Sequence, residues 1–383
     1  MKTLKEGDFH NKTVLVRCDF NIGIDQQNQI ADDFRIRQCL PTIEYLLGQN
    51  SRVVLLSHLE KNGKLLSLKI VRDRLEKLLN MPIAFANDCI GNAPAKGIKA
   101  INPGQAILLE NLRFHNGEKN NDDKFAYSLS QLGQIYVNDA FASSHRNHAS
   151  IVGLPKYLPS YAGLLLESEI DNLSKILKNP THPFVVIIGG AKISTKAKTI
   201  ANILNIADHL MTGSKIGEAL LIQKHILPNK HPIEYDESLQ KIDLTNPKIH
   251  LPIDGVMALA DLSEGYLRQA AIGSIRSEEE IYDIGPETIK FYKEIIKDAK
   301  TIFFNGPLGL IENPEFIAGT REILDAISKN HQAFKVAGGG ETIEIINRLN
   351  LQKSFNFLST GGGAMLEFLA GEILPGISAL NQK

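Results

Sequence analysis

Short apolar runs rich in β-branched residues alternate with segments of helical periodicity along the whole chain. In the first half these runs are TVLVRCDF, SRVVLLSH, MPIAFA, QAILLENL and QIYVNDAF, and in the second half PFVVIIGG, DHLMTG, KIHLPIDGVMAL, KTIFFNGP, FKVAGGG and FNFLSTGGG. Between the first runs, RIRQCLPTIEYLLGQ and SLKIVRDRLEKLLN place apolar residues three and four apart, as amphipathic helices do. Strands that alternate with helices form parallel sheets of right-handed βαβ units. The pattern therefore predicts an α/β fold.

The length of 383 residues exceeds what one ordinary hydrophobic core requires and predicts two domains or more. The segment ESEIDNLSKILKNPTHP reads as a helix that ends in a stop containing Pro and His, just before a new strand. We expect a first domain over residues 1–166, a connecting helix and hinge over residues 167–183, and a second domain over residues 184–364. Each domain would be a doubly wound parallel sheet, with ligands at the carboxyl ends of the strands.

The composition excludes several classes of protein. With 43% hydrophobic and 22% charged residues and a formal net charge of −1, the chain has no overall attraction to nucleic acid or anionic membranes. No apolar run approaches the roughly 18 residues needed to span a bilayer, and the first residues lack a secretory signal pattern. Cys18, Cys39 and Cys89 are widely spaced, which is typical of reduced thiols. We therefore expect a cytoplasmic protein.

Glycines follow the strands of the second half, at Gly189–Gly190, Asn305–Pro307, Gly338–Gly340 and Gly361–Gly363. Three of these four junctions lead directly into a helical pattern, where bare backbone amides can approach an anion. The spacing fits neither a Walker A loop nor a dinucleotide-binding fingerprint. Lys192 and Lys196 follow the first junction one helical turn apart and could reach one anionic group. A phosphate-binding surface is the prediction; tight turns without a ligand and two solvated lysines are the alternative.

In the first half the strands end in basic and polar residues. They are Arg17, Asp19, Asn21, Arg35, Arg37, His58, Lys61, Arg113, His115, His145, Arg146 and His148. Guanidinium groups bind carboxylate and phosphate oxygens in bidentate geometry, so their convergence at one sheet edge predicts an anion site. The HRNH motif could also be a metal-binding pair, but no third cluster of ligands accompanies it.

The two halves together are typical of a phosphotransferase with two substrates. Two anions repel each other unless water is excluded and positive charge is supplied. Phosphoryl transfer needs mainly in-line positioning and neutralisation of charge, which the two kinds of strand end would provide. Up to this point the residues name no substrate.

Nine motifs occur in an order that resembles the phosphoglycerate kinase family over essentially the whole chain. They are VRCDFN, DDFRIRQCLPTI, LLENLRF, VNDAFASSHRNHAS, IIGGAKIS, DIGPET, FFNGPLGLIE, AGGGET and STGGGAMLEFLAGEILPGISAL. The resemblance implies a 3-phosphoglycerate-binding first domain and a second domain that binds ADP or ATP with Mg²⁺. It also implies a glycolytic monomer in which domains close about a hinge, and in which residues 365–383 return to the first domain.

The resemblance also implies roles for residues of the first domain. Asp19 and Asn21 would bind the hydroxyl and carboxylate groups of the glycerate, and Arg35 would be the catalytic arginine. A basic patch that holds the 3-phosphate would be completed by His58, Arg113 and Arg146.

In the second domain, Lys192 would bridge the moving phosphoryl group, and the amides of Gly361, Gly362 and Gly363 would face it. Glu341 would bind the metal. The resemblance assigns nucleotide binding to Gly190, Lys192, Lys196, Gly213, Asn305, Pro307, Glu312, Gly339, Gly340, Glu341 and Thr342.

Five motifs depart from the family pattern, DAFAS and FFNGPLGLIE among them, and the other three affect expected site residues. SHLEKN places Lys61 where an arginine of the basic patch is expected, and a lysine lacks the bidentate fork. GGGET places Glu341 where a metal-binding aspartate is expected, although glutamate also offers oxygen ligands to Mg²⁺. In MTGSKIGEALL only Gly213 of a glycine triplet is present. We therefore keep two alternatives: a related enzyme that phosphorylates another small carboxylate, and a diverged paralogue that binds nucleotide without catalysis.

Overall fold

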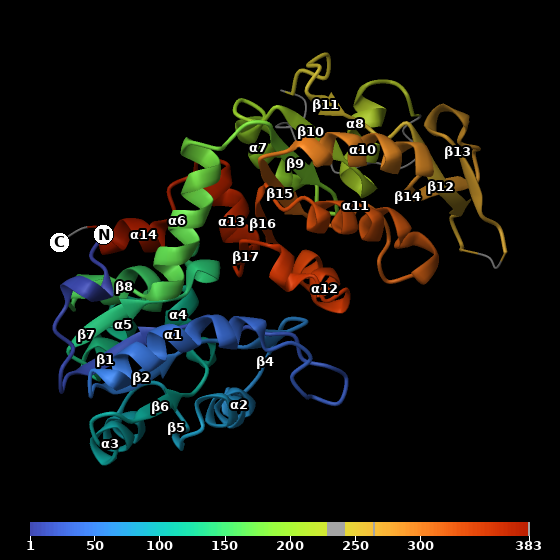
Figure 1. The fold of residues 1–383 in the computed structure, drawn as a ribbon. Coiled ribbons are helices and arrows are strands. Elements are labelled where there is room, and N and C mark those ends of the chain that lie inside the picture. Colours follow the sequence, from blue (N-terminus) through green and yellow to red (C-terminus); the bar gives the residue numbers. More distant parts are fainter. Residues whose placement is uncertain (228–241, 263–264, 382–383) are drawn as a thin grey trace. The chain divides into compact units, whose positions relative to one another are not determined.

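The structure is a computed structural model that describes residues 1–227, 242–262 and 265–381 (Figure 1). The chain forms two compact units. The first consists of Met1–Asp171 together with Ile373–Lys383, and the second of Asn172–Glu372. Each unit is built on a six-stranded sheet of its own.

The sheet of the first unit has the order β5-β6-β2-β1-β7-β8, and its strands are parallel. Val14 in β1 pairs with Val53 on one side and Ile135 on the other. All strand residues of β1 after the first are buried, because this strand is covered on both faces. The strands are β1 (Thr13–Arg17), β2 (Arg52–Leu56), β5 (Ile83–Ala86), β6 (Ala106–Leu109), β7 (Ile135–Asn138) and β8 (Ser160–Ala162).

The two helices predicted in the first half pack on this sheet. They are α1 (Phe34–Gly48) and α2 (Lys69–Leu79). In α1 the residues Ile36, Cys39 and Ile43 are spaced three and four apart and belong to the same buried cluster as the strand residues. The unit also contains the hairpin β3 (Glu60–Lys61) and β4 (Lys64–Leu65), and the helices α3 (Asn92–Ala100), α4 (Asn116–Lys119), α5 (Asp123–Ser130) and α14 (Pro375–Leu380).

The second unit repeats the scheme, with the strand order β11-β10-β9-β15-β16-β17, again parallel. Its strands are β9 (Phe184–Ile188), β10 (His209–Thr212), β11 (Ile249–His250), β15 (Thr301–Asn305), β16 (Phe334–Gly338) and β17 (Phe357–Ser359). Its helices include α7 (Ser194–Ile203), α8 (Ser214–Gln223), α10 (Pro286–Asp298), α11 (Ala318–Lys329), α12 (Gly340–Arg348) and α13 (Gly362–Leu369). The expected α/β fold of parallel sheets is confirmed.

One predicted strand, KIHLPIDGVMAL, is two. Only β11 joins the parallel sheet, and the chain then passes Pro252, which has no N–H to donate to a ladder. The second piece, β12 (Asp254–Leu259), forms an antiparallel sheet with β13 (Arg268–Ala271) and β14 (Glu279–Ile284). The prediction of one parallel strand was therefore wrong at this point.

The helix expected as the connector is α6 (Leu164–Lys178), which includes the sequence boundary between the units. It begins before residue 167 because the carboxylate of Asp139 accepts hydrogen bonds from the amides of Leu165, at 2.9 Å, and Leu166, at 3.2 Å. These contacts satisfy amides that lack an intrahelical partner.

The chain returns to the first unit after Glu372 rather than after residue 364. Helix α13 stays with the second unit because Thr199 donates a hydrogen bond to the carbonyl oxygen of Leu366, at 2.8 Å. Beyond it, the amide of Gly376 donates to the carbonyl oxygen of Ser144 in the first unit, at 2.8 Å.

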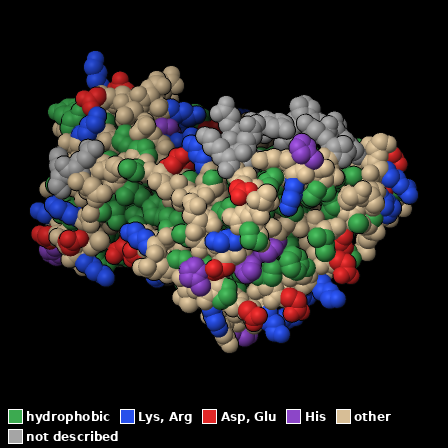
Figure 2. Space-filling view, turned by 90° about the horizontal axis from the view of Figure 1, so that it is seen from above, with side chains coloured by type: hydrophobic (Ala, Val, Ile, Leu, Met, Phe, Trp, Pro, Cys, Tyr) green, Lys and Arg blue, Asp and Glu red, His purple; other side chains and the backbone are tan. Residues whose placement is uncertain are grey.

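Charged side chains of both signs are interspersed on the face shown in Figure 2, in keeping with the net charge of −1. Among the described residues, no helix combines the length and the apolar character that crossing a membrane requires.

Candidate functional site

Each parallel sheet contains one pair of neighbouring strands from which the chain continues toward opposite edges of the sheet. In the first unit this pair is β1 and β7, and in the second it is β9 and β15. The loops that leave such a pair diverge and form a crevice at the carboxyl ends of the strands, which is where open α/β sheets bind ligands. Asp19 and Asn21 follow β1, Arg146 follows β7, and Lys192 follows β9, whereas several other residues singled out in the sequence follow neighbouring strands of the same sheets or lie in helices.

In the first unit, the carboxylate of Asp19 lies just beyond β1 and is almost completely buried. Arg35 Nη1 donates to Asp19 Oδ1 at 3.2 Å and to the carbonyl oxygen of Asn21 at 2.8 Å. Ser143 Oγ donates to the other carboxylate oxygen at 2.7 Å. Burial alone would raise the pKa of Asp19, but the charges of Arg35 and Arg17 and the hydrogen bond from Ser143 outweigh it and hold that pKa well below its usual range. Asp19 is thus ionised and fixes the position of Arg35.

Arg17, the last residue of β1, is fully buried beside His58. Its Nη2 lies 3.1 Å from His58 Nδ1, and its Nε donates to Ser150 Oγ at 2.8 Å. Burial lowers the pKa of His58 well below its usual value, so the ring is neutral at pH 7. Since an arginine only donates, Nδ1 must be the acceptor and the ring proton lies on Nε2. His58 is therefore oriented as a hydrogen-bond donor.

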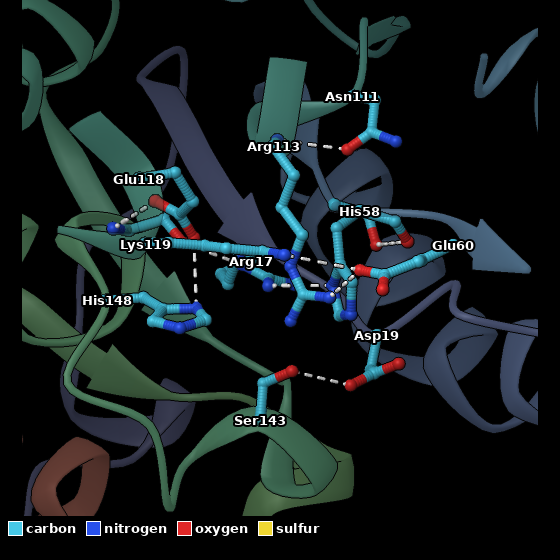
Figure 3. Close-up of polar contacts among 12 residues, drawn as sticks. Arg17, Asp19, His58, Glu60, Asn111, Arg113, Glu118, Lys119, Ser143 and His148 are labelled. Atoms are coloured by element: carbon cyan, nitrogen blue, oxygen red, sulfur yellow. Dashed lines mark hydrogen bonds and ion pairs between the residues drawn. The ribbon is translucent and has the colours of Figure 1, made fainter. Parts of the chain in front are cut away.

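The buried carboxylate of Glu118 completes this support. Glu118 Oε1 accepts from Ser150 Oγ at 2.6 Å, and Oε2 accepts from the amide of Ser150 at 2.9 Å. Ser150 thus links Glu118 to Arg17. Both Arg17 and Glu118 are labelled in Figure 3. A buried arginine with these partners is rigid, and it supplies positive charge at a defined place.

Arg113 and Lys119 approach the same region from the segment that follows β6 (Figure 3). Burial, followed by the charges of Arg113, Arg17, Arg146 and Lys119, lowers the pKa of His148 to about 4. These cations are therefore close enough to act on one imidazole. We call the following residues the basic patch: Arg17, Arg35, His58, Arg113, Lys119 and Arg146.

Two sequence-predicted residues, Arg37 and His115, lie outside the basic patch, since Arg37 pairs with Asp33 at 2.8 Å and His115 Nε2 lies 2.7 Å from Asp88 Oδ1. Lys61 and Asn21 have contacts of their own. Lys61 Nζ donates to the backbone oxygen of Asp25 at 2.6 Å, so its ammonium group is held on a neighbouring loop. The side-chain oxygen of Asn21 accepts the amide of Glu60 at 2.9 Å, which leaves its NH₂ group to face a ligand. The structure thus gathers His58 and the predicted arginines other than Arg37, but directs Lys61 elsewhere.

In the second unit, a buried lysine, Lys196, lies at the corresponding strand ends. Lys196 Nζ donates to the carbonyl oxygen of Gly189. A methyl group added to Gly190 would lie 2.7 Å from Lys196 Nζ, and one added to Gly306 would lie 2.5 Å from it. Both glycines also have positive φ, 86° and 85°. Burial lowers the pKa of Lys196 to about 8, against the attraction of Glu341, so the amine is still mostly charged at neutral pH.

Asn305, Pro307 and Thr342 hold the loops around this lysine. Asn305 Nδ2 donates to the Gly338 carbonyl oxygen at 2.6 Å, and the amide of Gly306 donates to Thr342 Oγ1 at 2.7 Å. The carbonyl oxygen of Pro307 accepts the amide of Gly190 at 2.7 Å. These residues shape the site through backbone contacts. Asn305 Oδ1 is buried and, within the described ranges, has no hydrogen-bond donor.

The triple glycine begins α13, but its three amides are not equivalent. The amide of Gly361 donates to Ser359 Oγ at 3.0 Å and is not available to a ligand in this arrangement. Gly362 is the first helical residue, and a methyl group added to it would meet no atom within 4 Å. Because the first amides of a helix lack intrahelical acceptors, Gly362 and Gly363 can offer theirs to an anion. The prediction that the amide of Gly361 faces the transferring phosphoryl group is therefore wrong for this structure.

Lys192, Glu312, Glu341 and Gly340 are exposed. Gly213 has a packing explanation, because a methyl group added to it would lie 2.9 Å from Leu308 Cδ2. The structure therefore gives Gly213 a role that needs no nucleotide.

The donor set fits a magnesium ion that arrives with a nucleotide. Glu341 lies in the first turn of α12, its carboxylate is exposed, and it acts electrostatically on Lys196. Mg²⁺ usually keeps several waters and is held by one or two carboxylates together with substrate phosphates. One accessible carboxylate close to a buried lysine meets the protein's part of that requirement.

Sequence reasoning missed the residues that orient the arginines: Ser143, Ser150 and Glu118. Their signal was weak. The serines lie in the motif VNDAFASSHRNHAS, but nothing in the motif shows which side chain they contact.

Comparison with known proteins gives consistent results. The family model described as phosphoglycerate kinase matches residues 4–372. A phosphoglycerate kinase from Herpetosiphon aurantiacus is 41% identical, with 100% of this chain and 99% of the relative covered. One from Borrelia turicatae is 40% identical, with 100% of both covered.

Solved structures agree. The phosphoglycerate kinase of Coxiella burnetii superimposes with a TM-score of 0.84 at 37% identity, covering 99% of this chain and 98% of the other. That of Pyrococcus horikoshii OT3 gives a TM-score of 0.89 at 32% identity, covering 100% and 98%. These matches confirm the resemblance indicated by the motifs and, with it, the expectation of a phosphotransferase. The chain belongs to the phosphoglycerate kinase family.

Proposed function

We propose that this chain catalyses reversible phosphoryl transfer between 1,3-bisphosphoglycerate and ADP, giving 3-phosphoglycerate and ATP in glycolysis. The basic patch carries the proposal, because in a member of this family it gathers arginines around a neutral histidine at the ligand-binding edge of one sheet. Such a patch suits a ligand with both a carboxylate and a phosphate.

On the glycerate side, the NH₂ group of Asn21 and the fixed guanidinium of Arg35 would bind the carboxylate and hydroxyl oxygens. Asp19 would accept a hydrogen bond from the hydroxyl group. His58 Nε2, Arg113 and Arg146 would bind the 3-phosphate. The rigidity of Arg17 and Arg35 supports this assignment, since groups that are already ordered lose little entropy when the substrate binds.

On the nucleotide side, Lys196 and the amides of Gly190, Gly339 and Gly340 would bind the phosphates of ADP or ATP. Lys192 and the amides of Gly362 and Gly363 would meet the transferring group. Glu341 would hold Mg²⁺, which when bound supplies positive charge to the phosphate oxygens. Gly213, Asn305, Pro307, Glu312 and Thr342 would complete the walls of this site.

The reaction requires no general base, because the accepting carboxylate of 3-phosphoglycerate is already ionised at neutral pH. The task of the chain is to align the acyl and nucleotide oxygens in line, to exclude water and to neutralise charge. Arg35 and Lys192 would stabilise the transition state from the two units, and closure about a hinge would bring them together. We also propose that the enzyme acts as a monomer in the cytoplasm.

The test is a coupled assay of purified protein with 3-phosphoglycerate, ATP and Mg²⁺. Arg35→Ala and Lys192→Ala should each lower kcat by about 10²–10³-fold, the range found when one preorganised electrostatic group is removed. Arg37→Ala is the control, because Arg37 is exposed and its side chain pairs with Asp33 at 2.8 Å.

Absence of turnover by folded wild-type protein would contradict the proposal. Calorimetric binding of ADP with Mg²⁺ but not of 3-phosphoglycerate would then favour the diverged paralogue. Turnover of another small carboxylate in a substrate panel would favour the related enzyme instead.

A further inference from the structure

An acidic side chain, Glu60, lies inside the basic patch (Figure 3). Glu60 Oε2 lies 2.7 Å from Arg113 Nη1 and 3.5 Å from Lys119 Nζ. It therefore pairs with Arg113, to which we assign the phosphate of the substrate, and with Lys119, another cation of the basic patch.

The position of Glu60 is fixed by its backbone. It opens the hairpin of β3 and β4, where it pairs with Leu65, and its amide donates to the side-chain oxygen of Asn21 at 2.9 Å. Burial opposes ionisation of Glu60, but its contacts with Arg113 and Lys119 prevail and hold the pKa of the carboxyl group below its usual value. The side chain is consequently an anion at neutral pH, and its backbone is held in place by these contacts.

Glu60 uses the same donors that a phosphate oxygen would use. A guanidinium N–H binds carboxylate and phosphate oxygens in the same geometry, and two anionic oxygens on one N–H repel each other. Arg113 also has spare capacity, since its buried Nε has no hydrogen-bond partner within the described ranges. A ligand phosphate that uses Nη1 of Arg113 as well as Nε must therefore displace Glu60 from Nη1.

We propose that Glu60 is a specificity-determining residue that competes with the ligand phosphate for Arg113 and Lys119. The inference rests on the proposed function, of which it refines the substrate side. Only a ligand whose phosphate binds Arg113 and Lys119 has to displace Glu60 from them. Glu60 thereby lowers the affinity for phosphorylated acids and leaves the affinity for simple carboxylates unchanged.

The test is the variant Glu60→Gln, which keeps the shape of the side chain and removes its charge. Titration calorimetry with 3-phosphoglycerate should give a dissociation constant about three- to tenfold lower than that of the wild type, a range set by a partly exposed ion pair. Glu60→Ala should tighten binding in the same direction. The preference for 3-phosphoglycerate over glycerate should rise in both variants, because glycerate has no phosphate that competes with Glu60.

The matched control is Asp73→Asn. Asp73 Oδ1 also lies 2.7 Å from an arginine, Nε of Arg72, in the same unit but outside the basic patch. This variant removes the same charge and should leave the dissociation constant unchanged.

Steady-state kinetics separates competition from a structural role. Competition predicts a lower KM for 3-phosphoglycerate in Glu60→Gln and an unchanged KM for ATP. Weaker binding of 3-phosphoglycerate would show that Glu60 only positions Arg113 and would overturn the proposal, as would an unchanged dissociation constant.

Inorganic phosphate makes this test independent of the proposed function. If the wild type does not turn over 3-phosphoglycerate, the proposed function fails, yet tighter phosphate binding by Glu60→Gln than by the wild type would still support competition. Equal phosphate binding by the two proteins would refute it.

Discussion

The two candidate sites lie at equivalent places in two parallel sheets but are built from different groups. In the first unit, side chains form the site, and carboxylates hold the arginines: Asp19 beside Arg35, and Glu60 beside Arg113. In the second unit, backbone forms most of the site, and one buried lysine lies among Gly189, Gly190 and Gly306. Substitution of a side chain in the first site changes its charge or its hydrogen bonds. Substitution of a closely packed glycine in the second site produces a collision with neighbouring atoms.

The largest effect that separates the two kinds of site is expected for Gly306→Ala. The added methyl group would collide with the carbonyl oxygen of Gly189 and lie 2.5 Å from Lys196 Nζ, at a residue with φ of 85°. We expect a loss of about 3–4 kcal/mol in the free energy of unfolding of the second unit, because strain and collision add. Denaturant unfolding followed by circular dichroism measures it.

Gly340→Ala is the control for that experiment. A methyl group at Gly340 meets nothing within 4 Å, and its stability should change by less than about 1 kcal/mol. Equal losses in both variants would show that close backbone approach is not what distinguishes the second site.

A smaller effect concerns a feature that the units share. Asp139 in the first unit accepts amides at the start of α6, and Asp283 in the second accepts the amide of Gly319, at 2.7 Å, at the start of α11. Burial raises the pKa of each carboxyl group to about 7, from an ordinary value of 3.8. The folded state thus keeps these protons to higher pH than the unfolded state does.

The contribution of Asp139 and Asp283 to stability should therefore fall as the pH rises from about 4 to about 7, because at these two carboxyl groups the folded state binds more protons than the unfolded state in this window. The histidines whose pKa burial lowers act in the opposite direction, so the effect is read as the difference between wild type and variant. Asp139→Asn and Asp283→Asn should each remove part of this slope, by about 1–3 kcal/mol over the window. Thermal unfolding measured at several pH values tests this. A slope that both variants retain would assign it to other groups.

The smallest effect is expected for Lys61→Ala. Because Lys61 Nζ donates to the backbone of Asp25, removal of its charge should change the dissociation constant for 3-phosphoglycerate by less than about threefold, as for other exposed charges. Arg113→Ala, measured by the same calorimetry, should weaken binding by more than about tenfold. A similar loss of affinity in the two variants would show that Lys61 also binds the ligand, as the sequence predicted.

The sequence was most informative about the centres of the sheets. Strands β1, β9 and β15 are buried on both faces and read as unbroken apolar runs, which is why they were predicted. Strands β13 and β14 were not predicted, because their residues are mixed in polarity and half-buried. Their sheet depends on antiparallel partners along the chain rather than on a pattern of their own.

For the candidate site, the sequence predicted which residues lie at the strand ends but not what they contact. Gly190 and Lys196 were predicted from a glycine-rich junction, because a close approach leaves its trace in the residue type. The pairing of Glu60 with Arg113 could not be predicted, since 53 residues separate the two and several cations were available. Likewise, the engagement of Gly361 by Ser359 follows from the local course of the backbone, which the motif STGGG does not specify.

The placement of helix α14 has a consequence for biosynthesis. A ribosome makes the second unit, which is contiguous in the chain, after most of the first unit. The first unit, by contrast, lacks its final helix until translation reaches Leu380. Until then, the backbone carbonyl of Ser144 has no Gly376 amide to accept, and the surface around Ile151 against which Gly376 packs is uncovered. The part of the protein that is synthesised first is thus the part that is finished last.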